Sequence, residues 1–198
     1  MSRLKGVSDH DAGLGAKIAF FFTKRKLAGM TGLETADMLE PLRMYAHIPR
    51  LLSAIGKLEQ AESKLDILTP RQRALAELKA ATTVRCEYCI DLGSQIARGI
   101  GLTDEELLAL ADYRNASCFS DVEKLILNYA TAISRTPVEV SDELFDALRA
   151  HFDTAQLVAL THIINLGNFR ARFNIALDIG SSGFSGTQVC ALADTNGR

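Results

Sequence analysis

The stretch LTPRQRALAELKAATTVRCEYC, residues 68–89, decides the fold of this chain. It opens with Thr69 and Pro70, a pair typical of a helix N-cap and of the first helical residue. Leu75 and Leu78 then follow at helical spacing, and the β-branched residues 82–84 indicate where this helix ends. The stretch closes on two cysteines, three residues apart, at the start of a second predicted helix.

The same helical pattern extends in both directions. No segment alternates apolar and polar residues with the period of a strand, so the chain is predicted to be all-α. The nearly all-round apolar segment 153–180 should be a central helix, while Ile18, Phe21 and Phe22 should face the core or a partner subunit. The remaining helices are predicted within residues 15–29, 33–47, 48–64, 69–84, 86–98, 102–112, 120–137 and 140–152.

Composition limits the classes of function. The chain has 198 residues, enough for one large domain, and a formal net charge of −2 with dispersed Lys and Arg, which gives no nucleic-acid footprint. No apolar run approaches the roughly 20 residues that span a bilayer. Without a recognisable export signal, we expect a cytoplasmic protein, and structural disulfides are rare in that reducing compartment. A CxxC pair there favours redox or metal chemistry.

Cys86 and Cys89 allow three interpretations. They lie one helical turn apart at a helix start, where free N–H groups and the helix dipole stabilise a thiolate, so the pair suits a redox-active dithiol. A zinc site would have to recruit Cys118, Cys190 or His162, because no second CxxC exists. The third interpretation is two small buried residues with no chemical role.

The quoted stretch resembles the carboxymuconolactone decarboxylase and alkyl hydroperoxidase D (AhpD-like) superfamily. Those proteins share a Pro-Arg helix start, an apolar helix and a Cys-x-Tyr-Cys opening the next helix, which correspond here to Pro70, Arg71 and the segment 86–89. Residues 46–58 are similar to the family's preceding helix and residues 157–177 to its closing helix. The resemblance covers about residues 39–178 and implies a compact all-helical subunit that assembles into trimers or hexamers.

In the hydroperoxidase branch the second cysteine attacks the peroxide and the first resolves it, which assigns these roles to Cys89 and Cys86. The family's proton relay does not carry over, because its Glu falls on Ala74 and its His on Gly93. Glu77, three residues after Ala74 on nearly the same helix face, is the candidate displaced carboxylate, with a solvated helix charge as the alternative.

Other residues near the motif have weaker expectations. Glu87 and Asp91 flank the second cysteine and would raise a thiol pKa unless they face water. Tyr88 should pack or donate a hydrogen bond. Asn165, Asn168 and Arg170 on the closing helix suit structural hydrogen bonds as well as substrate contact, and His162 suits an interior position.

The sequence therefore predicts a thiol-dependent hydroperoxide reductase that is re-reduced by a protein or small-molecule dithiol. It predicts a homo-oligomer with no resident cofactor or metal, no nucleic-acid partner and no membrane span. A lyase of the decarboxylase type and a non-catalytic redox-sensing oligomer are the alternatives. We expect an N-terminal arm and helix over residues 1–38, the helical domain over 39–180 and an irregular tail over 181–198.

Overall fold

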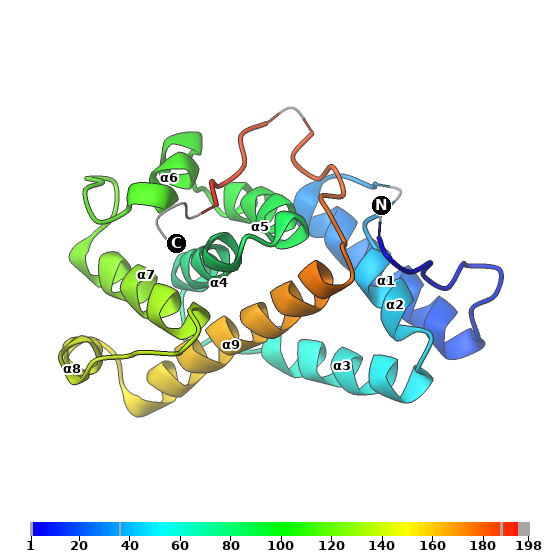
Figure 1. Cartoon of the computed structure of the whole chain (residues 1–198), viewed down its shortest axis with the longest axis horizontal. Coiled ribbons are helices and arrows are strands. Elements are labelled where there is room, and N and C mark those ends of the chain that lie inside the picture. The colour runs from blue at the N-terminus through cyan, green and yellow to red at the C-terminus, as the bar shows by residue number, and fades with distance from the viewer. Residues whose placement is uncertain (1, 36, 187, 194–198) are drawn as a thin grey trace.

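A computed structural model describes residues 2–35, 37–186 and 188–193. Within these ranges the chain forms nine α-helices and one 3-10 helix and no strand, which confirms the all-α prediction (Figure 1). The helices are α1 (Leu14–Thr31), α2 (Glu40–Tyr45), α3 (Pro49–Glu62), α4 (Pro70–Val84), α5 (Glu87–Gly99), α6 (Asp104–Ala109), η1 (Leu110–Asp112), α7 (Asp121–Ser134), α8 (Asp142–Arg149) and α9 (Thr154–Ala176).

Helix α4 lies in the middle of the molecule, with α5, α7 and α9 packed around it (Figure 1). Its alanines let these neighbours approach closely, and residues 74–76 and 78–82 are all buried. Helix α9 also packs against several helices, as expected of a central helix, but it is not buried all round, because Val158 and Phe169 are exposed to solvent.

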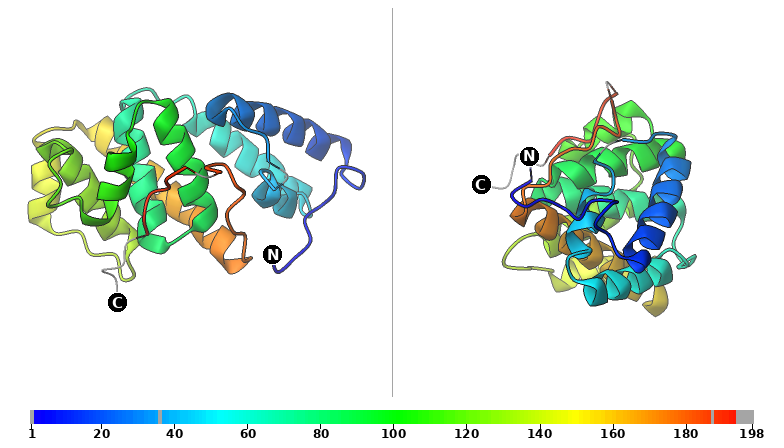
Figure 2. Two further views of the ribbon diagram at one scale, coloured as in Figure 1. Left: turned by 90° about the horizontal axis from the view of Figure 1, so that it is seen from above. Right: turned by 90° about the vertical axis from the view of Figure 1, so that its right-hand side faces the viewer.

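Three apolar clusters make up the core. One lies between α4, α7, α8 and α9, and a second between α4, α5, α6 and α7. The third joins α1, α2, α5 and the end of α9, and it contains Cys86. Figure 2 shows the N-terminal helices at one end of the molecule and α7 and α8 at the other, so the cysteine motif lies between the two ends.

Local helix signals are confirmed at most of the predicted starts. Thr69 and Gln72 form a reciprocal capping box at α4, and Thr103 and Glu106 form another at α6. Ser120 is the N-cap of α7. Each box satisfies two backbone N–H groups that the first helical turn leaves without partners.

Several expectations fail where long-range packing decides. On α1, Phe20 is 4% exposed while Phe21 and Phe22 are 62% and 63% exposed, so for these two and the exposed Ile18 the core is excluded and contact with a partner subunit stays a prediction. On α3, Leu52 is buried whereas the neighbouring Leu51 is exposed. Helix α9 ends at Ala176 rather than near residue 180, because Asp178 takes a left-handed conformation with φ 57°.

The part of the chain after α9 that the structure describes has neither helix nor strand, as predicted. This C-terminal segment runs back along α5 (Figure 2). Among the described residues, no helix combines the length and the apolarity that crossing a bilayer requires.

Candidate active site

A tight turn between α4 and α5 places the cysteine motif. Arg85 follows the last residue of α4 in a left-handed conformation, with φ 61° and ψ 42°. The backbone N–H of Cys86 donates to the carbonyl of Ala81 at 3.0 Å, and that of Arg85 donates to the carbonyl of Thr82 at 3.3 Å. These two bonds form a Schellman motif, so the end of α4 fixes the start of α5.

Cys86 and Cys89 are joined in a disulfide, with their Cα atoms 5.3 Å apart. Cys86 is the N-cap of α5, and its sulfur accepts the backbone N–H of Cys89 at 3.3 Å. The Cys86 side chain is 0% exposed, whereas Cys89 is only partly buried and contacts two of the apolar clusters. The pair is thus asymmetric, with one sulfur enclosed and one closer to solvent. Cys118 and Cys190 are free thiols.

Asn174, in the last turn of α9, has a polar side chain that reaches the disulfide. Its amide nitrogen lies 3.5 Å from the Cys89 sulfur and 3.9 Å from the Cys86 sulfur. Asn174 is 3% exposed, so water does not compete strongly for this amide. Sequence reasoning considered Asn165 and Asn168 on this helix and missed Asn174, whose only signal was its place in the closing-helix pattern.

Tyr88, between the two cysteines, is buried and both packs and donates. Its hydroxyl donates to the carbonyl of Met38 at 2.6 Å, and its ring meets that of Phe184 edge to face at 5.9 Å. Burial, and to a lesser degree the nearby Asp91, raises the pKa of the Tyr88 hydroxyl. Tyr88 therefore stays neutral and ties the cysteine turn to the segment before α2.

Glu77 belongs to a cluster of charged side chains from α3, α4 and α9. Arg170 binds Glu59 through two hydrogen bonds of 2.6 and 2.7 Å, also pairs with Glu62, and lies 3.7 Å from Glu77. Arg73 adds contacts of 2.9 Å to Glu62 and 3.6 Å to Glu77. The cluster holds three carboxylates and two guanidinium groups, so one proton would neutralise it.

Within this cluster, the proton is assigned to the carboxyl group of Glu77. Burial raises the pKa of Glu77 to about 7, against the attraction of Arg170 and Arg73 and with help from the adjacent Glu62 carboxyl. The Glu77 side chain keeps 31% of its surface exposed, which leaves it open to exchange with solvent. It is a carboxyl group that changes protonation near neutral pH, one helix before the cysteines.

The two relay positions of the resemblance are closed by packing. Ala74 is buried in the same apolar cluster that Cys89 contacts. At Gly93, a Cβ atom would lie 3.0 Å from Cδ2 of Leu78, so a larger side chain there would require the end of the Leu78 side chain to shift. The structure has aliphatic side chains where the family's Glu and His would stand.

Asp91 fastens the C-terminal segment to α5. Its carboxylate accepts the backbone N–H groups of Ser182, Phe184 and Ser185 at 2.7–3.1 Å and the Ser181 hydroxyl at 2.8 Å. Burial would raise the pKa of Asp91, but these hydrogen bonds outweigh it and the pKa is lowered. Asp91 is 3% exposed and so does not face water, and its carboxylate is turned toward this segment; its effect on the thiol pKa stays a prediction.

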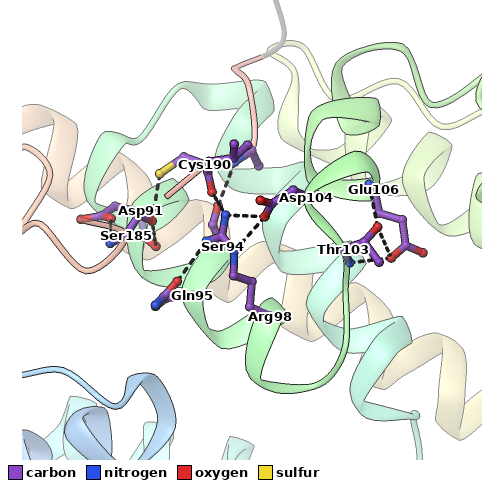
Figure 3. Close-up of polar contacts among 11 residues, drawn as sticks. Asp91, Ser94, Gln95, Arg98, Thr103, Asp104, Glu106, Ser185 and Cys190 are labelled. Carbon is purple, nitrogen blue, oxygen red and sulfur yellow. Dashed lines mark hydrogen bonds and ion pairs between the residues drawn. The ribbon is translucent and has the colours of Figure 1, made fainter. Parts of the chain in front are cut away.

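Further along α5 the same segment makes more contacts (Figure 3). The hydroxyl of Ser94 accepts the backbone N–H of Ala191 at 2.9 Å, and Arg98 pairs with Asp104 at 2.7 Å and donates to the carbonyl of Val189. The Cys190 sulfur lies 2.9 Å from the Ser185 hydroxyl. These contacts hold the segment against the helix that carries the cysteines, while Glu87 on that helix is exposed.

The other candidates lie elsewhere on α9. Asn168 donates to the hydroxyl of Ser134 at 2.9 Å, and Asn165 donates to the carbonyl of Thr161 in its own helix. His162 is partly exposed rather than interior. Within the described residues, no group of three or more His, Cys, Asp or Glu side chains is arranged to hold a metal ion.

A pocket of about 480 Å³ opens between α1 and residues 35–43. Its apolar lining includes Phe20, Met38 and Leu39, which belong to the same cluster as Cys86. Lys17 and Lys24 stand among its polar lining residues. Neither Cys86 nor Cys89 is among the residues that line the pocket, and three of its apolar lining residues share a packed cluster with Cys86.

An all-α subunit in which a CxxC pair caps a helix defines the AhpD-like class of fold. The chain belongs to the carboxymuconolactone decarboxylase family, whose sequence pattern matches residues 49–132. It is 41% identical over 152 residues to the protein YnjA of Escherichia coli strain K12, an alignment that covers 74% of this chain and 81% of YnjA.

Solved structures share the fold at low sequence identity. The debrominase Bmp8 superposes with a TM-score of 0.72 at 20% identity, covering 87% of this chain and 90% of Bmp8. A peroxidase-related protein of Ralstonia eutropha JMP134, described as an alkylhydroperoxidase AhpD core, superposes with a TM-score of 0.67 at 20% identity and covers 92% and 94% of the two chains. At this identity the likeness shows the fold alone.

Proposed function

We propose that this protein reduces organic hydroperoxides through the Cys86–Cys89 pair. The observation that carries the proposal is the asymmetry of the disulfide at the start of α5, where Cys86 is fully enclosed and Cys89 is partly exposed. An attacking thiol must meet its substrate, whereas a resolving thiol needs to reach only its neighbour. The asymmetry supports Cys89 as the attacking residue and Cys86 as the resolving one.

The reaction begins from the reduced pair. The Cys89 thiolate attacks one oxygen of the hydroperoxide, the O–O bond breaks, and Cys89 becomes a sulfenic acid while the leaving alkoxide takes a proton and departs as an alcohol. The Cys86 thiol then attacks the Cys89 sulfur, which forms the disulfide and releases water. A dithiol reductant returns both cysteines to thiols and is itself oxidised to a disulfide.

Glu77 is proposed as the proton-transfer group. A carboxyl group with a pKa near 7 holds a proton for part of the time at neutral pH and can give it to the alkoxide. Its contacts are with Arg73 and Arg170 rather than with the cysteine sulfurs, so this role requires a substrate or a water molecule between Glu77 and Cys89.

The pocket beside α1 supports an organic rather than an inorganic peroxide. Its apolar lining suits a hydrocarbon substituent. On this proposal, cumene hydroperoxide reacts faster than hydrogen peroxide, which has no substituent to place there.

A homo-oligomer, a trimer or a hexamer, is part of the proposal. Exposed apolar side chains on α1 and α3, including Phe21, Phe22 and Leu51, provide surface that a second copy of the chain would bury. Sedimentation of the wild type beside Phe21→Glu tests this, because a charge inside an interface lowers the oligomer mass and a charge in solvent leaves it unchanged.

The test of the activity is dithiothreitol-dependent consumption of cumene hydroperoxide by the wild type, Cys89→Ser and Cys86→Ser. We expect no turnover by either variant. Cys86→Ser should still react once, giving a sulfenic acid on Cys89 that dimedone traps, because only the resolving step is lost. Cys118→Ser is the matched control and should keep wild-type turnover.

Two alternatives make different predictions in this assay. A lyase of the decarboxylase type would consume no hydroperoxide in this assay. Its decarboxylase activity, measured separately, would persist in Cys89→Ser, since that chemistry needs no thiol pair. A redox-sensing oligomer would form the disulfide reversibly without steady turnover of peroxide. Hydroperoxide consumption by Cys89→Ser equal to that of the wild type would overturn the proposed function.

A further inference from the structure

The surroundings of Cys89 contain one polar group whose role the assigned residues leave open. The family's His position is Gly93, closed by Leu78, and Glu77 lies among arginines rather than at the sulfurs. Asn174 is the side chain whose amide reaches both sulfurs, at 3.5 Å from Cys89 and 3.9 Å from Cys86. Asn174 lies on α9, which follows the cysteine motif in the chain, whereas Leu78 lies on α4, which precedes it.

The backbone around Asn174 is fixed on both sides. Four residues earlier on the same face of α9, Arg170 is held by its two hydrogen bonds to Glu59. After Asn174, the backbone N–H of Ile179 donates to the Asn174 carbonyl at 2.9 Å, a bond that the left-handed Asp178 allows. Ile179 is itself buried in the cluster that contains Cys86. The amide therefore approaches the sulfurs from a rigid helix end.

We propose that Asn174 is a catalytic residue, whose amide N–H donates a hydrogen bond to the Cys89 sulfur and stabilises it as the attacking thiolate. This inference rests on the proposed function for its catalytic meaning. A hydrogen bond to a charged acceptor is stronger than one to a neutral acceptor, and a disulfide sulfur is a weak acceptor. The amide accordingly favours the reduced thiolate over the disulfide.

On this proposal, two residues carry out the two tasks of a proton relay: stabilising the thiolate and protonating the leaving oxygen. An amide has no proton to exchange near neutral pH, so Asn174 holds negative charge on the sulfur without competing for the proton. Proton delivery to the leaving oxygen remains with Glu77. A histidine can do both, whereas this site separates the two tasks between α9 and α4.

The test measures the ionisation of Cys89 without any peroxide. In a Cys86→Ser background, the rate of alkylation of Cys89 by iodoacetamide is followed against pH by peptide mass spectrometry, which separates Cys89 from Cys118 and Cys190. Replacing Asn174 by Leu, which has a similar volume and no donor, should move the midpoint up by about one pH unit, and Asn174→Asp should move it further. Asn165→Leu, on the same helix but with an amide that donates to the Thr161 carbonyl, should leave it unchanged.

A second measurement needs no substitution at Asn174 and decides the matter if Asn174→Leu fails to fold. In protein labelled with ¹⁵N-asparagine, one side-chain NH₂ group should follow the titration of Cys89. A midpoint in Asn174→Leu within 0.2 pH unit of the parent, or no side-chain amide that follows the titration, overturns the inference. If hydroperoxide turnover is absent but the midpoint moves, the proposed function fails and the hydrogen bond to the thiolate stands.

Discussion

Glu77 on α4 and Arg170 on α9 hold a carboxylate oxygen and a guanidinium nitrogen 3.7 Å apart. One turn further along α9, Asn174 meets the disulfide. The same face of α9 thus carries, in order, a contact to the acidic cluster and a contact to the redox centre. The contact of Glu77 with α9 therefore lies one helical turn along α9 from the residue that contacts the cysteine pair.

Glu77→Gln should slow hydroperoxide turnover tenfold to a hundredfold, because it removes a general acid and keeps the shape. The wild-type rate should depend on an ionisation near pH 7, the value to which burial raises the pKa of Glu77. That dependence should disappear in the variant. Glu105→Gln, an exposed glutamate on α6, is the control and should keep both the rate and its pH dependence.

The same substitution should change how stability depends on pH. Between about pH 4.5, the ordinary pKa of a glutamate, and about pH 7, the folded state keeps a proton on Glu77 that the unfolded state has released. Unfolding is therefore favoured progressively as pH rises through this window. Urea unfolding at pH 5 and pH 8 should show that the wild type loses roughly 1–2 kcal/mol more than Glu77→Gln. Equal losses would contradict the raised pKa.

Asp91→Asn should loosen the C-terminal segment from α5. The carboxylate accepts four hydrogen bonds from residues 181–185, and an amide in its place turns an NH₂ group toward donors. We expect a loss of roughly 2–3 kcal/mol in unfolding free energy and faster hydrogen exchange at residues 182–185. Glu87→Gln on the same helix should change neither.

The pH dependence that Asp91 contributes has the opposite sign to that of Glu77. Because its pKa is lowered in the folded state, its stabilisation is present above its ordinary pKa of 3.8 and is lost as pH falls through the folded value. In the wild type, we expect the protection of residues 182–185 against hydrogen exchange to be lower in acid than at neutral pH. In Asp91→Asn, the protection should already be low at neutral pH. Wild-type protection of these amides that stays constant as the pH falls below 4 would contradict this expectation.

Arg71→Met should destabilise the fold without altering the redox centre. Arg71, part of the motif that carries the family resemblance, bridges Glu106 at 2.6 Å and Glu123 at 2.5 Å and so ties α4 to α6 and α7. Two half-buried carboxylates would lose their partner, at a cost of roughly 1–2 kcal/mol. Arg149→Met, which removes an exposed pair on α8, is the matched control. A melting temperature equal to the wild type's would show that Arg71 has another role.

The local features of the fold could be predicted from the sequence. The capping boxes at Thr69 and Thr103 involve residues three apart, so each helix start is written in a few letters. The position of Cys86 at a helix start follows for the same reason. The sequence did not predict that α4 is more completely buried than α9. Burial depends on which helices pack around each one, and those contacts join segments that are distant in the chain.

The same difference between local and long-range contacts applies to the candidate site. Cys86 and Cys89 could be recognised as a pair from their spacing, and Glu77 as a candidate carboxylate whose role stays a prediction. Asn174 could not be recognised, because it is 85 residues from Cys89 in the chain and meets it only through the packing of α9 against α5. The contacts of Asp91 with residues 181–185 join segments about 90 residues apart in the chain, so its place beside Cys89 did not reveal them.

The measurement that tests the central claim most directly is a count of thiols after one equivalent of cumene hydroperoxide is added to the fully reduced protein. The account predicts rapid loss of two of the four thiols, with Cys86 and Cys89 found in one disulfide and Cys118 and Cys190 still free. It also predicts that Cys89→Ser abolishes this rapid loss. Thiol loss no faster than that of free cysteine, or loss confined to Cys118 and Cys190, would contradict the account.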